Sequence, residues 1–520
     1  MVSAERGLPD SFDPATGKNI KWVAKLGSQN HSTPIVAGGR VFIGTNNNEP
    51  RDPKHQGDRG VFMCFDEKTG RLLWQLVVPK RDEDAYMDWP NMGMSSTATV
   101  EGDPDKGIGA GRVYLVDNRG AVLCLDVKGL ADGNDGPFRD EAAYMTSPAP
   151  AGSPPRREVG AETRPEPLRP PADGKLLAPG PLDADILWKF DLVSDAGIWP
   201  HDAAHSSILI HGDQLYLNTA SGVDNTHKRV RAPDAPSLVV LDKTTGKLLA
   251  RDDEHIALNV FHNTWASPSL GKVNGRELIF FCGGNGVVYA FEPFRSRRGD
   301  EADRPTTFKD RLLTSAATNA VATLKKVFQF DFDPTAPKTD VHKFNSNRRE
   351  GPSNLYGMPA FVADRLYVAG GGDIWWGKNE AWLKCLDATK TGDITTNSLV
   401  WSYPLEKHVM STPAVHNGLV FIADCGRTFH CVDARTGKPH WTHAIQGEVW
   451  ASPLVADGKV YLGTRSGNFY VFAAGKEKKV LSEMELVTPI SATTTAANGV
   501  LYVATMTHLY AVQNGAQLKN

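Results

Sequence analysis

The sequence is short of three features, and each shortage excludes a class of protein. It has only 6 cysteines in 520 residues, too few for a small scaffold held together by disulfides. No apolar run reaches the roughly 18 residues that a membrane-spanning helix needs. Neither sign of charge dominates, since 57 Lys and Arg stand against 60 Asp and Glu. Without a basic block, the chain gives no reason to expect nucleic acid or an anionic membrane surface as partner.

The N-terminus also lacks the apolar stretch of a signal peptide, because Met1 to Arg6 reads Met-Val-Ser-Ala-Glu-Arg. From these residues alone the protein is either cytoplasmic or has had its leader removed.

What the sequence has in quantity is turn residues, with 49 Gly and 34 Pro, and this favours an all-β chain. It also has an internal repeat. Three segments read almost alike: residues 32–74, 411–441 and 451–461. Weaker copies begin near Ser95, Ser206, Ala266, Gly357 and Ala492. Together these make eight copies.

Each copy of the repeat has a physical interpretation. A Ser-x-Pro stretch opens an inner strand, and a glycine turn such as Asp457-Gly458 leads to an apolar strand. The third strand ends in Asp-x-x-Thr-Gly, where the Asp accepts backbone N–H bonds and the Gly takes a positive φ. The following Trp, as in Trp74 and Trp441, suits a plug between neighbouring sheets. The pattern predicts an all-β chain: a single β-propeller of eight four-stranded antiparallel blades.

Closure of the ring can also be predicted. The last copy, residues 491–512, supplies three strands, and the missing fourth unit stands at the beginning as Asp13-Pro-Ala-Thr-Gly17 followed by Trp22. Residues 13–22 are therefore expected to form the outermost strand of the last blade, which removes an exposed sheet edge. The whole of 1–520 is then one propeller domain closed by its N- and C-terminal segments.

Insertions interrupt the repeat at about 130–184 and 293–326, and a looser stretch covers 331–356. The first is rich in proline over 137–181, as expected of an extended loop. Solvated decoration is the simplest interpretation of each, although long loops are also where function tends to lie.

One position per copy is expected at a mouth of the central channel, three residues before the inner-strand proline. These residues are His31, Met94, His205, Trp265, Tyr356, Met410, Trp450 and Ser491. Small molecules usually bind in such a mouth. The ring could equally be a plug of the channel, and metal or redox chemistry is a third alternative.

A histidine cluster is the richest local feature. His201, His205 and His262 could converge on a metal ion, because imidazole binds Zn, Cu, Ni or Fe. Met94 and Met410 would favour Cu(I) if they took part. The spacing is not a metal motif, however, and histidines in a polar channel are more often hydrogen-bonded than metal-bound.

The cysteines predict no disulfide. Four of them, Cys64, Cys124, Cys385 and Cys431, occupy one equivalent position in separate repeats. They are expected to be buried fillers that lie too far apart to bridge.

The repeat resembles the PQQ-like propeller family, which includes quinoprotein alcohol dehydrogenases and an outer-membrane assembly lipoprotein. The resemblance covers nearly the whole chain through its Asp-x-x-Thr-Gly and Trp pattern. The opening Gly7-Leu-Pro, leading to Asn19-Ile-Lys-Trp22, is similar to the start of secreted members just after their leader. It implies an extracytoplasmic location, periplasmic or secreted, with the leader absent from this sequence.

The same resemblance argues against the family's cofactors. Quinoprotein dehydrogenases hold Ca²⁺ and PQQ with a carboxylate, an Asn and a catalytic Asp, and many stack a vicinal disulfide on the quinone. This chain has no adjacent cysteines, and Ser221 and Asn263 stand where the resemblance implies the metal-binding Asn and the catalytic Asp. A neutral amide cannot act as a base, so PQQ and calcium are disfavoured.

Two hypotheses remain for function. The first, which is favoured, is a binding scaffold with a small molecule or a protein on one propeller face and no enzymatic activity. The second is an oxidoreductase that uses PQQ or a transition metal at the channel mouth, where Trp265 and Trp450 could stack on a planar cofactor.

Overall fold

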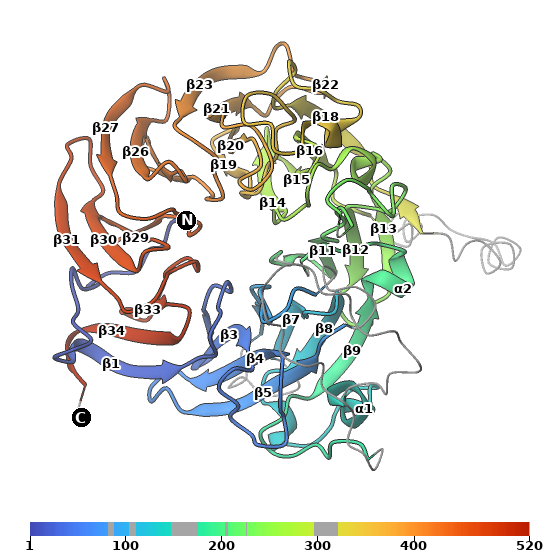
Figure 1. Cartoon of the computed structure of the whole chain (residues 1–520), viewed down its shortest axis with the longest axis vertical. Coiled ribbons are helices and arrows are strands. Elements are labelled where there is room, and N and C mark those ends of the chain that lie inside the picture. Colours follow the sequence, from blue (N-terminus) through green and yellow to red (C-terminus); the bar gives the residue numbers. More distant parts are fainter. Residues whose placement is uncertain are drawn as a thin grey trace, which may run out of the picture.

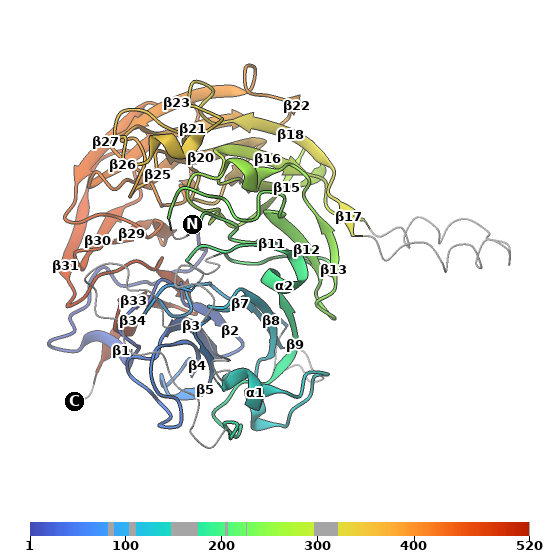
Figure 2. The same cartoon turned by 45° about the vertical axis from the view of Figure 1, so that its right-hand side comes forward.

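Eight β-sheets stand around a central channel like the blades of a propeller (Figure 1). The structure, a computed structural model, describes residues 1–81, 88–102, 111–146, 175–202, 206–224, 226–295 and 321–518. Figure 2 shows the same ring turned by 45°, with successive colours in successive blades. The predicted all-β, eight-bladed propeller is confirmed, and each blade begins at the repeat copy that predicted it.

The strands of blades 1 to 4 are, in blade 1, β2 (Ile35–Ala37), β3 (Arg40–Asn46), β4 (Arg59–Asp66) and β5 (Leu72–Pro79); in blade 2, β6 (Thr99–Glu101), β7 (Arg112–Val116), β8 (Ala121–Asp126) and β9 (Ile186–Asp191); in blade 3, β10 (Leu209–His211), β11 (Gln214–Asn218), β12 (Leu238–Asp242) and β13 (Leu248–Arg251); and in blade 4, β14 (Ser269–Val273), β15 (Arg276–Cys282), β16 (Val287–Phe291) and β18 (Lys326–Asp331).

Those of blades 5 to 8 are, in blade 5, β19 (Ala360–Val362), β20 (Arg365–Gly371), β21 (Ala381–Asp387) and β23 (Leu399–Leu405); in blade 6, β24 (Ala414–His416), β25 (Leu419–Ala423), β26 (Thr428–Asp433) and β27 (Pro439–Ala444); in blade 7, β28 (Leu454–Ala456), β29 (Lys459–Gly463), β30 (Asn468–Ala473) and β31 (Val480–Glu485); and in blade 8, β32 (Thr495–Ala497), β33 (Val500–Ala504), β34 (His508–Gln517) and β1 (Lys18–Lys25).

Two blades gain a fifth, very short strand from a neighbouring connection. β17 (Ala322–Thr323) pairs in parallel with β13, and β22 (Gly392–Asp393) pairs in parallel with β18. The helices are short and lie in connections: α1 (Glu141–Met145), α2 (Leu192–Ala196), and the 3₁₀ helices η2 (Gly129–Ala131), η3 (Ile256–Asn259) and η4 (Val341–Phe344). None of the helices among the described residues is long and apolar enough to span a bilayer.

The ring closes as the displaced repeat unit predicts. β1 pairs antiparallel with β34, with Trp22 opposite Ala511 and Lys25 opposite His508. Asp13 and Gly17 form the tight turn before β1, in which the Gly17 N–H donates to the Asp13 carbonyl at 2.8 Å. Because β1 supplies the outermost strand of blade 8, the first and last segments of the chain share one sheet.

The residues before β1 extend this closure to blade 7. The Met1 amino group donates to the carbonyl of Pro453, and Val2 forms a bridge with Val455. Farther along, the Tyr461 hydroxyl and the Lys459 ammonium donate to carbonyls of the segment at Pro9 and Leu8. In Figure 1 the N-terminus accordingly lies beside β29, inside the ring.

The core is divided into eight apolar clusters, one at each junction between neighbouring blades. Alternate side chains of a strand point to opposite faces. In blade 2, for example, Leu115 packs toward blade 1 while Tyr114 packs toward blade 3. Both faces of every blade are thereby buried, so the ring is stable only when it is complete.

The repeat's tryptophan joins five of the blades to the next one. Five of these indoles donate Nε1–H to a backbone carbonyl at the turn that follows the third strand of the next blade, at 2.9–3.1 Å: Trp22 to Glu67, Trp74 to Val127, Trp188 to Lys243, Trp401 to Ala434 and Trp441 to Gly475. In three of these turns the glycine of Asp-x-x-Thr-Gly lies directly against the indole: Gly70, Gly246 and Gly437. The Asp-x-x-Thr-Gly motif therefore stabilises the junction between neighbouring blades as well as its own turn.

This contact makes a testable distinction between two glycines with the same backbone conformation. Gly437 has φ +72°, and a Cβ on it would lie 2.7 Å from the Trp401 ring, whereas Gly458 has φ +69° with nothing within 4 Å. Both alanine variants should lose about 1–2 kcal/mol to left-handed strain. G437A should lose a further ~1–3 kcal/mol to overpacking. Denaturant midpoints of the two variants check this, and equal losses would contradict it.

All six cysteines are buried free thiols, as the repeat position predicts for Cys64, Cys124, Cys385 and Cys431. Most of the two predicted insertions falls on 147–174 and 296–320, outside the described residues.

Candidate functional site at the channel mouth

A cavity of about 210 Å³ opens among the segments that lead into the inner strands. It is lined by His31, Met92, Asp202, Trp265, Tyr356, Trp375, Met410, Trp450 and Ser491. Six of these belong to the predicted ring: His31, Trp265, Tyr356, Met410, Trp450 and Ser491. Counting from the inner-strand proline therefore brings together residues from blades far apart in sequence.

One member of the predicted ring differs from this arrangement. Met94 is 1% exposed and packs in the apolar cluster between blades 1 and 2. The preceding Gly93 has φ +73°, a reversal of the backbone that turns Met94 inward, and Met92 lines the cavity. His205 lies outside the described residues.

Aromatic rings meet at the cavity in two orientations. The ring centroids of Trp265 and Tyr356 lie 4.9 Å apart with a tilt of 35°. Trp375 stands nearly perpendicular to both Trp265 and Trp450, at 84° and 82°, with centroids 5.6 and 5.8 Å away. Such edge-to-face contacts are favourable arrangements of aromatic quadrupoles. Trp375 thus forms a wall that crosses the other rings.

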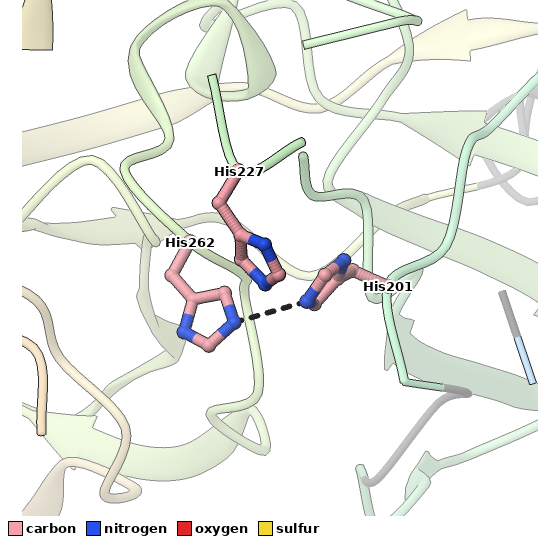
Figure 3. A group of neighbouring side chains, drawn as sticks. All are labelled: His201, His227 and His262. Carbon is pink, nitrogen blue, oxygen red and sulfur yellow. Dashed lines mark hydrogen bonds between the residues drawn. The ribbon is translucent and has the colours of Figure 1, made fainter. Parts of the chain in front are cut away.

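Three imidazoles converge beside this aromatic wall (Figure 3). His201 precedes blade 3, His227 lies between β11 and β12, and His262 precedes blade 4. One ring nitrogen from each lies within 4.8 Å of the others. His201 and His262, two members of the cluster expected from the sequence, lie side by side, and His227 is a further imidazole beside them.

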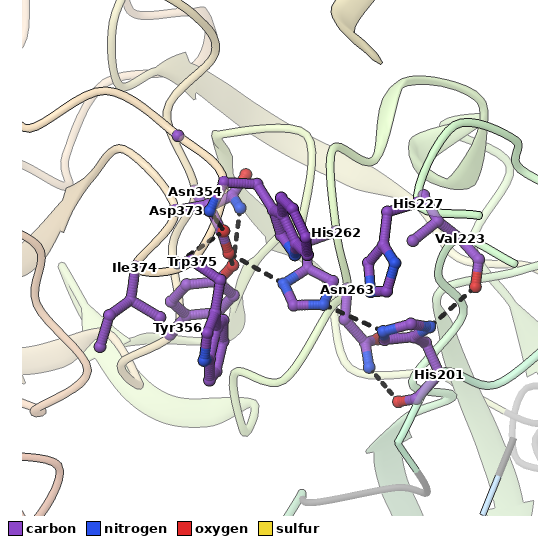
Figure 4. Close-up of polar contacts among 12 residues, drawn as sticks. His201, Val223, His227, His262, Asn263, Asn354, Tyr356, Asp373, Ile374 and Trp375 are labelled. Carbon is purple, nitrogen blue, oxygen red and sulfur yellow. Dashed lines mark hydrogen bonds and ion pairs between the residues drawn. The ribbon is translucent and has the colours of Figure 1, made fainter. Parts of the chain in front are cut away.

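His262 and Asp373 form the buried centre of a polar network (Figure 4). His262 Nδ1 lies 2.9 Å from Asp373 Oδ2, which also accepts from the Tyr356 hydroxyl. Asp373 Oδ1 accepts from the backbone N–H groups of Trp375 and Trp376 at 3.0 and 2.6 Å. All four lone-pair directions of the carboxylate are therefore occupied by His262, by Tyr356 and by the loop that carries the tryptophans.

The same network sets the protonation of its members. Burial opposes charge on His262, but the Asp373 carboxylate and its hydrogen bond raise the pKa of this imidazole above its ordinary value. Burial would likewise raise the pKa of Asp373, yet His262 and the hydrogen bonds hold it below the usual range. Burial and the neighbouring carboxylate raise the pKa of Tyr356 well above its ordinary value.

His227 reaches the cluster from a loop with an unusual backbone. Its φ is +54°, and its carbonyl accepts from the Asn345 side-chain amide. Its ring packs on Trp376 with centroids 5.0 Å apart. Burial, followed by repulsion from His201 and His262, lowers its pKa to about 4, so this imidazole is neutral at physiological pH.

Comparisons with known proteins agree with the fold. The family model described as "Outer membrane protein assembly factor BamB" matches residues 11–134 and 379–480. The chain has the fold of the PQQ-like propellers. BamB from Moraxella catarrhalis is 11% identical with a TM-score of 0.52, over 96% of this chain and 99% of that one.

Two dehydrogenases have the same propeller fold. A europium-containing methanol dehydrogenase is 12% identical with a TM-score of 0.53, over 97% of this chain and 87% of that one. The quinohemoprotein alcohol dehydrogenase ADHIIG from Pseudomonas putida HK5 is 12% identical with a TM-score of 0.52, over 100% and 79%. No curated protein sequence matches the chain. At such identities the likeness defines the fold, and activity must be argued from the site.

The polar groups at the channel mouth do not fit a calcium ion. Ca²⁺ takes six to eight oxygen ligands. Here Asp373 is saturated by donors, and Asn263 accepts from the Thr264 N–H while its amide donates to the His201 carbonyl. Ser221 leaves one fully buried hydroxyl, which cannot replace a ligand set. The groups that remain include three imidazoles, which prefer transition metals.

Proposed function

We propose that the protein is an extracytoplasmic binding propeller that holds a small, flat ring compound in the mouth of its channel. The observation that carries the proposal is the cavity of about 210 Å³ with aromatic walls in two orientations. Ligand sites are concave and mostly apolar, with a few polar groups that fix orientation. Asp202, His31 and Ser491 supply such groups here.

The size of the cavity limits the ligand to one or two rings. It lies below the ~300 Å³ at which pockets for drug-sized molecules begin. A flat ring can lie against Trp375 and meet the edge or face of Trp265. One aromatic face at this mouth already holds a planar group: the Arg465 guanidinium lies 4.0 Å from the Trp450 ring centroid, and it donates to Ser491 at 2.7 Å.

The extracytoplasmic location is proposed because the matching family model is named for an outer-membrane assembly factor. The described helices include no membrane span. A chain near charge neutrality, at −3, gives no attraction to nucleic acid.

Indole and quinoline are suitable probes, with cyclohexanol as the non-aromatic control. We expect saturation-transfer NMR to show contact with both aromatic probes and none with cyclohexanol. Trp375→Ala removes one wall of the cavity and should weaken binding roughly 10- to 100-fold, which corresponds to about 1.4–2.8 kcal/mol.

Trp376→Ala is the matched control, because it removes the same ring from the same loop but from a position against His227. It should retain most of the binding. Equal binding by wild type and Trp375→Ala, or equal losses in the two variants, would show that the cavity is not the binding site.

A further inference from the structure

The tautomers of two of the clustered histidines are fixed by their partners. His201 Nδ1 lies 2.9 Å from the Val223 carbonyl oxygen, and His262 Nδ1 lies 2.9 Å from Asp373 Oδ2. A carbonyl and a carboxylate only accept hydrogen bonds, so each Nδ1 must carry its hydrogen. In the neutral rings, each Nε2 then presents a lone pair.

These two lone pairs face one another. His201 Nε2 and His262 Nε2 are 3.0 Å apart (Figure 3), and both residues are almost fully buried. Two acceptors at that distance repel unless a cation stands between or beside them. Two nitrogens bound to one tetrahedral ion at about 2.0–2.1 Å lie roughly 3.3–3.4 Å apart, so a shift of a few tenths of an ångström converts this pair into two ligands.

We propose that His201, His227 and His262 bind one divalent first-row transition-metal ion, with its fourth position directed to the channel-mouth cavity. A proton could bridge two rings, but the third imidazole lies within 4.8 Å of both and gives the three-nitrogen set of an open metal site. The inference goes beyond the proposed ring binding and does not depend on it.

The fourth position is marked by Asp202. This residue lines the cavity, and its Oδ2 lies 3.6 Å from His201 Nε2. Its carboxylate can complete the coordination or give way to a donor atom that enters the cavity. The negative charges of Asp202 and Asp373 also offset the charge of a divalent ion bound by neutral rings.

The surroundings of the triad hold the ligands in place. Metal-bound histidines usually donate their second ring N–H to a carboxylate or a carbonyl. Here His262 donates to the Asp373 carboxylate and His201 donates to the Val223 carbonyl. The Asn263 amide donates to the His201 carbonyl. Asn263 thus supports the backbone of a histidine ligand.

A second group of possible ligands shows the contrast. Asp52, His55 and Asp183 also lie close together. The Lys54 ammonium, however, is 2.5 Å from Asp183 and 3.6 Å from Asp52. A lysine of the chain therefore already neutralises the carboxylates of that group, whereas the charged side chain beside the facing Nε2 atoms is the carboxylate of Asp202.

Cobalt(II) titration of the full chain, after dialysis against a chelator, tests the proposal. We expect one equivalent to bind with the intense visible bands of four-coordinate cobalt, and Zn²⁺ to displace it. His262→Ala and His227→Ala should each weaken Co²⁺ binding at least 100-fold. His227 is only partly buried, so its variant keeps the test valid if His262→Ala fails to fold.

Three further variants separate a metal site from a merely structural cluster. Asp373→Asn should weaken Co²⁺ binding roughly 10- to 100-fold through the orientation of His262. His211→Ala removes a partly exposed histidine of blade 3 that pairs with Glu277 of blade 4, and it should bind Co²⁺ like the wild type. Trp375→Ala should also retain the metal, which separates this test from that of ring binding.

The proposal is overturned if the full chain binds no stoichiometric Co²⁺ or Zn²⁺, or gives only six-coordinate cobalt spectra. It is also overturned if His211→Ala loses as much affinity as His227→Ala. A strongly deshielded proton between His201 and His262 in metal-supplemented protein, seen by NMR, would assign the facing nitrogens to a shared proton instead.

Discussion

A chain that lacks residues 1–25 is expected to remain unfolded or to aggregate. The deletion removes β1, which leaves the β34 edge of blade 8 without its partner, and exposed strand edges pair with other chains. It also removes four large apolar side chains that are at most 5% exposed: Leu8, Phe12, Ile20 and Trp22. At about 1.5–3 kcal/mol each, their loss is comparable to the ~5–15 kcal/mol that stabilises a typical protein.

The structure also predicts how the defect can be repaired. A synthetic peptide of residues 1–25, added during refolding of the truncated chain, should restore soluble protein with near-native circular dichroism. The peptide supplies both the strand and the Trp22 indole that donates to the Glu67 carbonyl of blade 1. A peptide with Trp22→Ala should rescue far less, because removal of a buried Trp costs about 3–5 kcal/mol.

Lys25→Ala in the full-length chain is the control, since this residue is exposed at the end of the same strand and should change stability by less than ~0.5 kcal/mol. A truncated chain that folds and melts like the full-length protein would show that closure does not depend on β1.

The closure and the blade junctions were predictable because they depend on residues that recur. Asp-x-x-Thr-Gly and Trp appear at the same offset in several copies, and each copy faces the same neighbour. The displaced copy at Asp13–Trp22 could therefore be assigned to the last blade. The ring at the channel mouth was located by the same counting, which placed residues such as Tyr356 and Trp450 at one cavity.

The other half of the site comes from segments that do not recur. Trp375 and Asp373 lie in the connection between β20 and β21, and His227 lies in that between β11 and β12. The lengths of these connections differ between blades, so no repeat position exists from which to count. The only local signal was the Trp375-Trp376 pair in a Gly-rich loop, because two neighbouring tryptophans are unusual in a solvated turn.

Their positions depend instead on contacts between distant residues. The Arg348 guanidinium donates to the carbonyls of Ile374, Trp375 and Gly377, and the Asn345 amide fixes the carbonyl of His227. Both residues belong to the stretch 331–356, for which solvated decoration is the simplest interpretation of the sequence. The contacts of this stretch with the loops of His227 and Trp375 are tertiary, so no periodicity in the sequence predicts them.

A buried ion pair anchors the connection between β20 and β21, which carries Trp375. Disruption of this pair is the second large effect that the structure predicts. Lys378 and Asp333 are 4% and 5% exposed, and the ammonium is paired with the carboxylate. Asp333 also accepts from the hydroxyls of Ser353 and Thr335 at 2.8 and 2.9 Å. Lys378→Met would leave a buried carboxylate without its counter-ion, which typically costs about 3–5 kcal/mol.

The pH dependence of this effect has a definite sign. Burial would raise the pKa of Asp333, but the hydrogen bond and charge of Lys378 hold it below the ordinary value. A carboxyl whose pKa is depressed by folding contributes stability above about pH 4, its unfolded value, and loses it as the pH falls through the folded pKa. The stability difference between wild type and Lys378→Met should therefore be large at neutral pH and shrink in acid.

The variant should also affect the site, because Lys378 follows the tryptophans of the same loop by only a few residues. With the anchor lost, Trp375 should no longer be held across Trp265 and Trp450, and indole binding should weaken together with the denaturant midpoint. Lys378→Met combined with Asp333→Leu removes both charges and should recover most of the stability. Lys390→Met, which breaks an exposed pair with Asp387, should lose less than ~1 kcal/mol. If Lys378→Met is as stable as Lys390→Met, the loop is held by Arg348 and Asp373 alone, and the wall of the cavity does not depend on the buried pair.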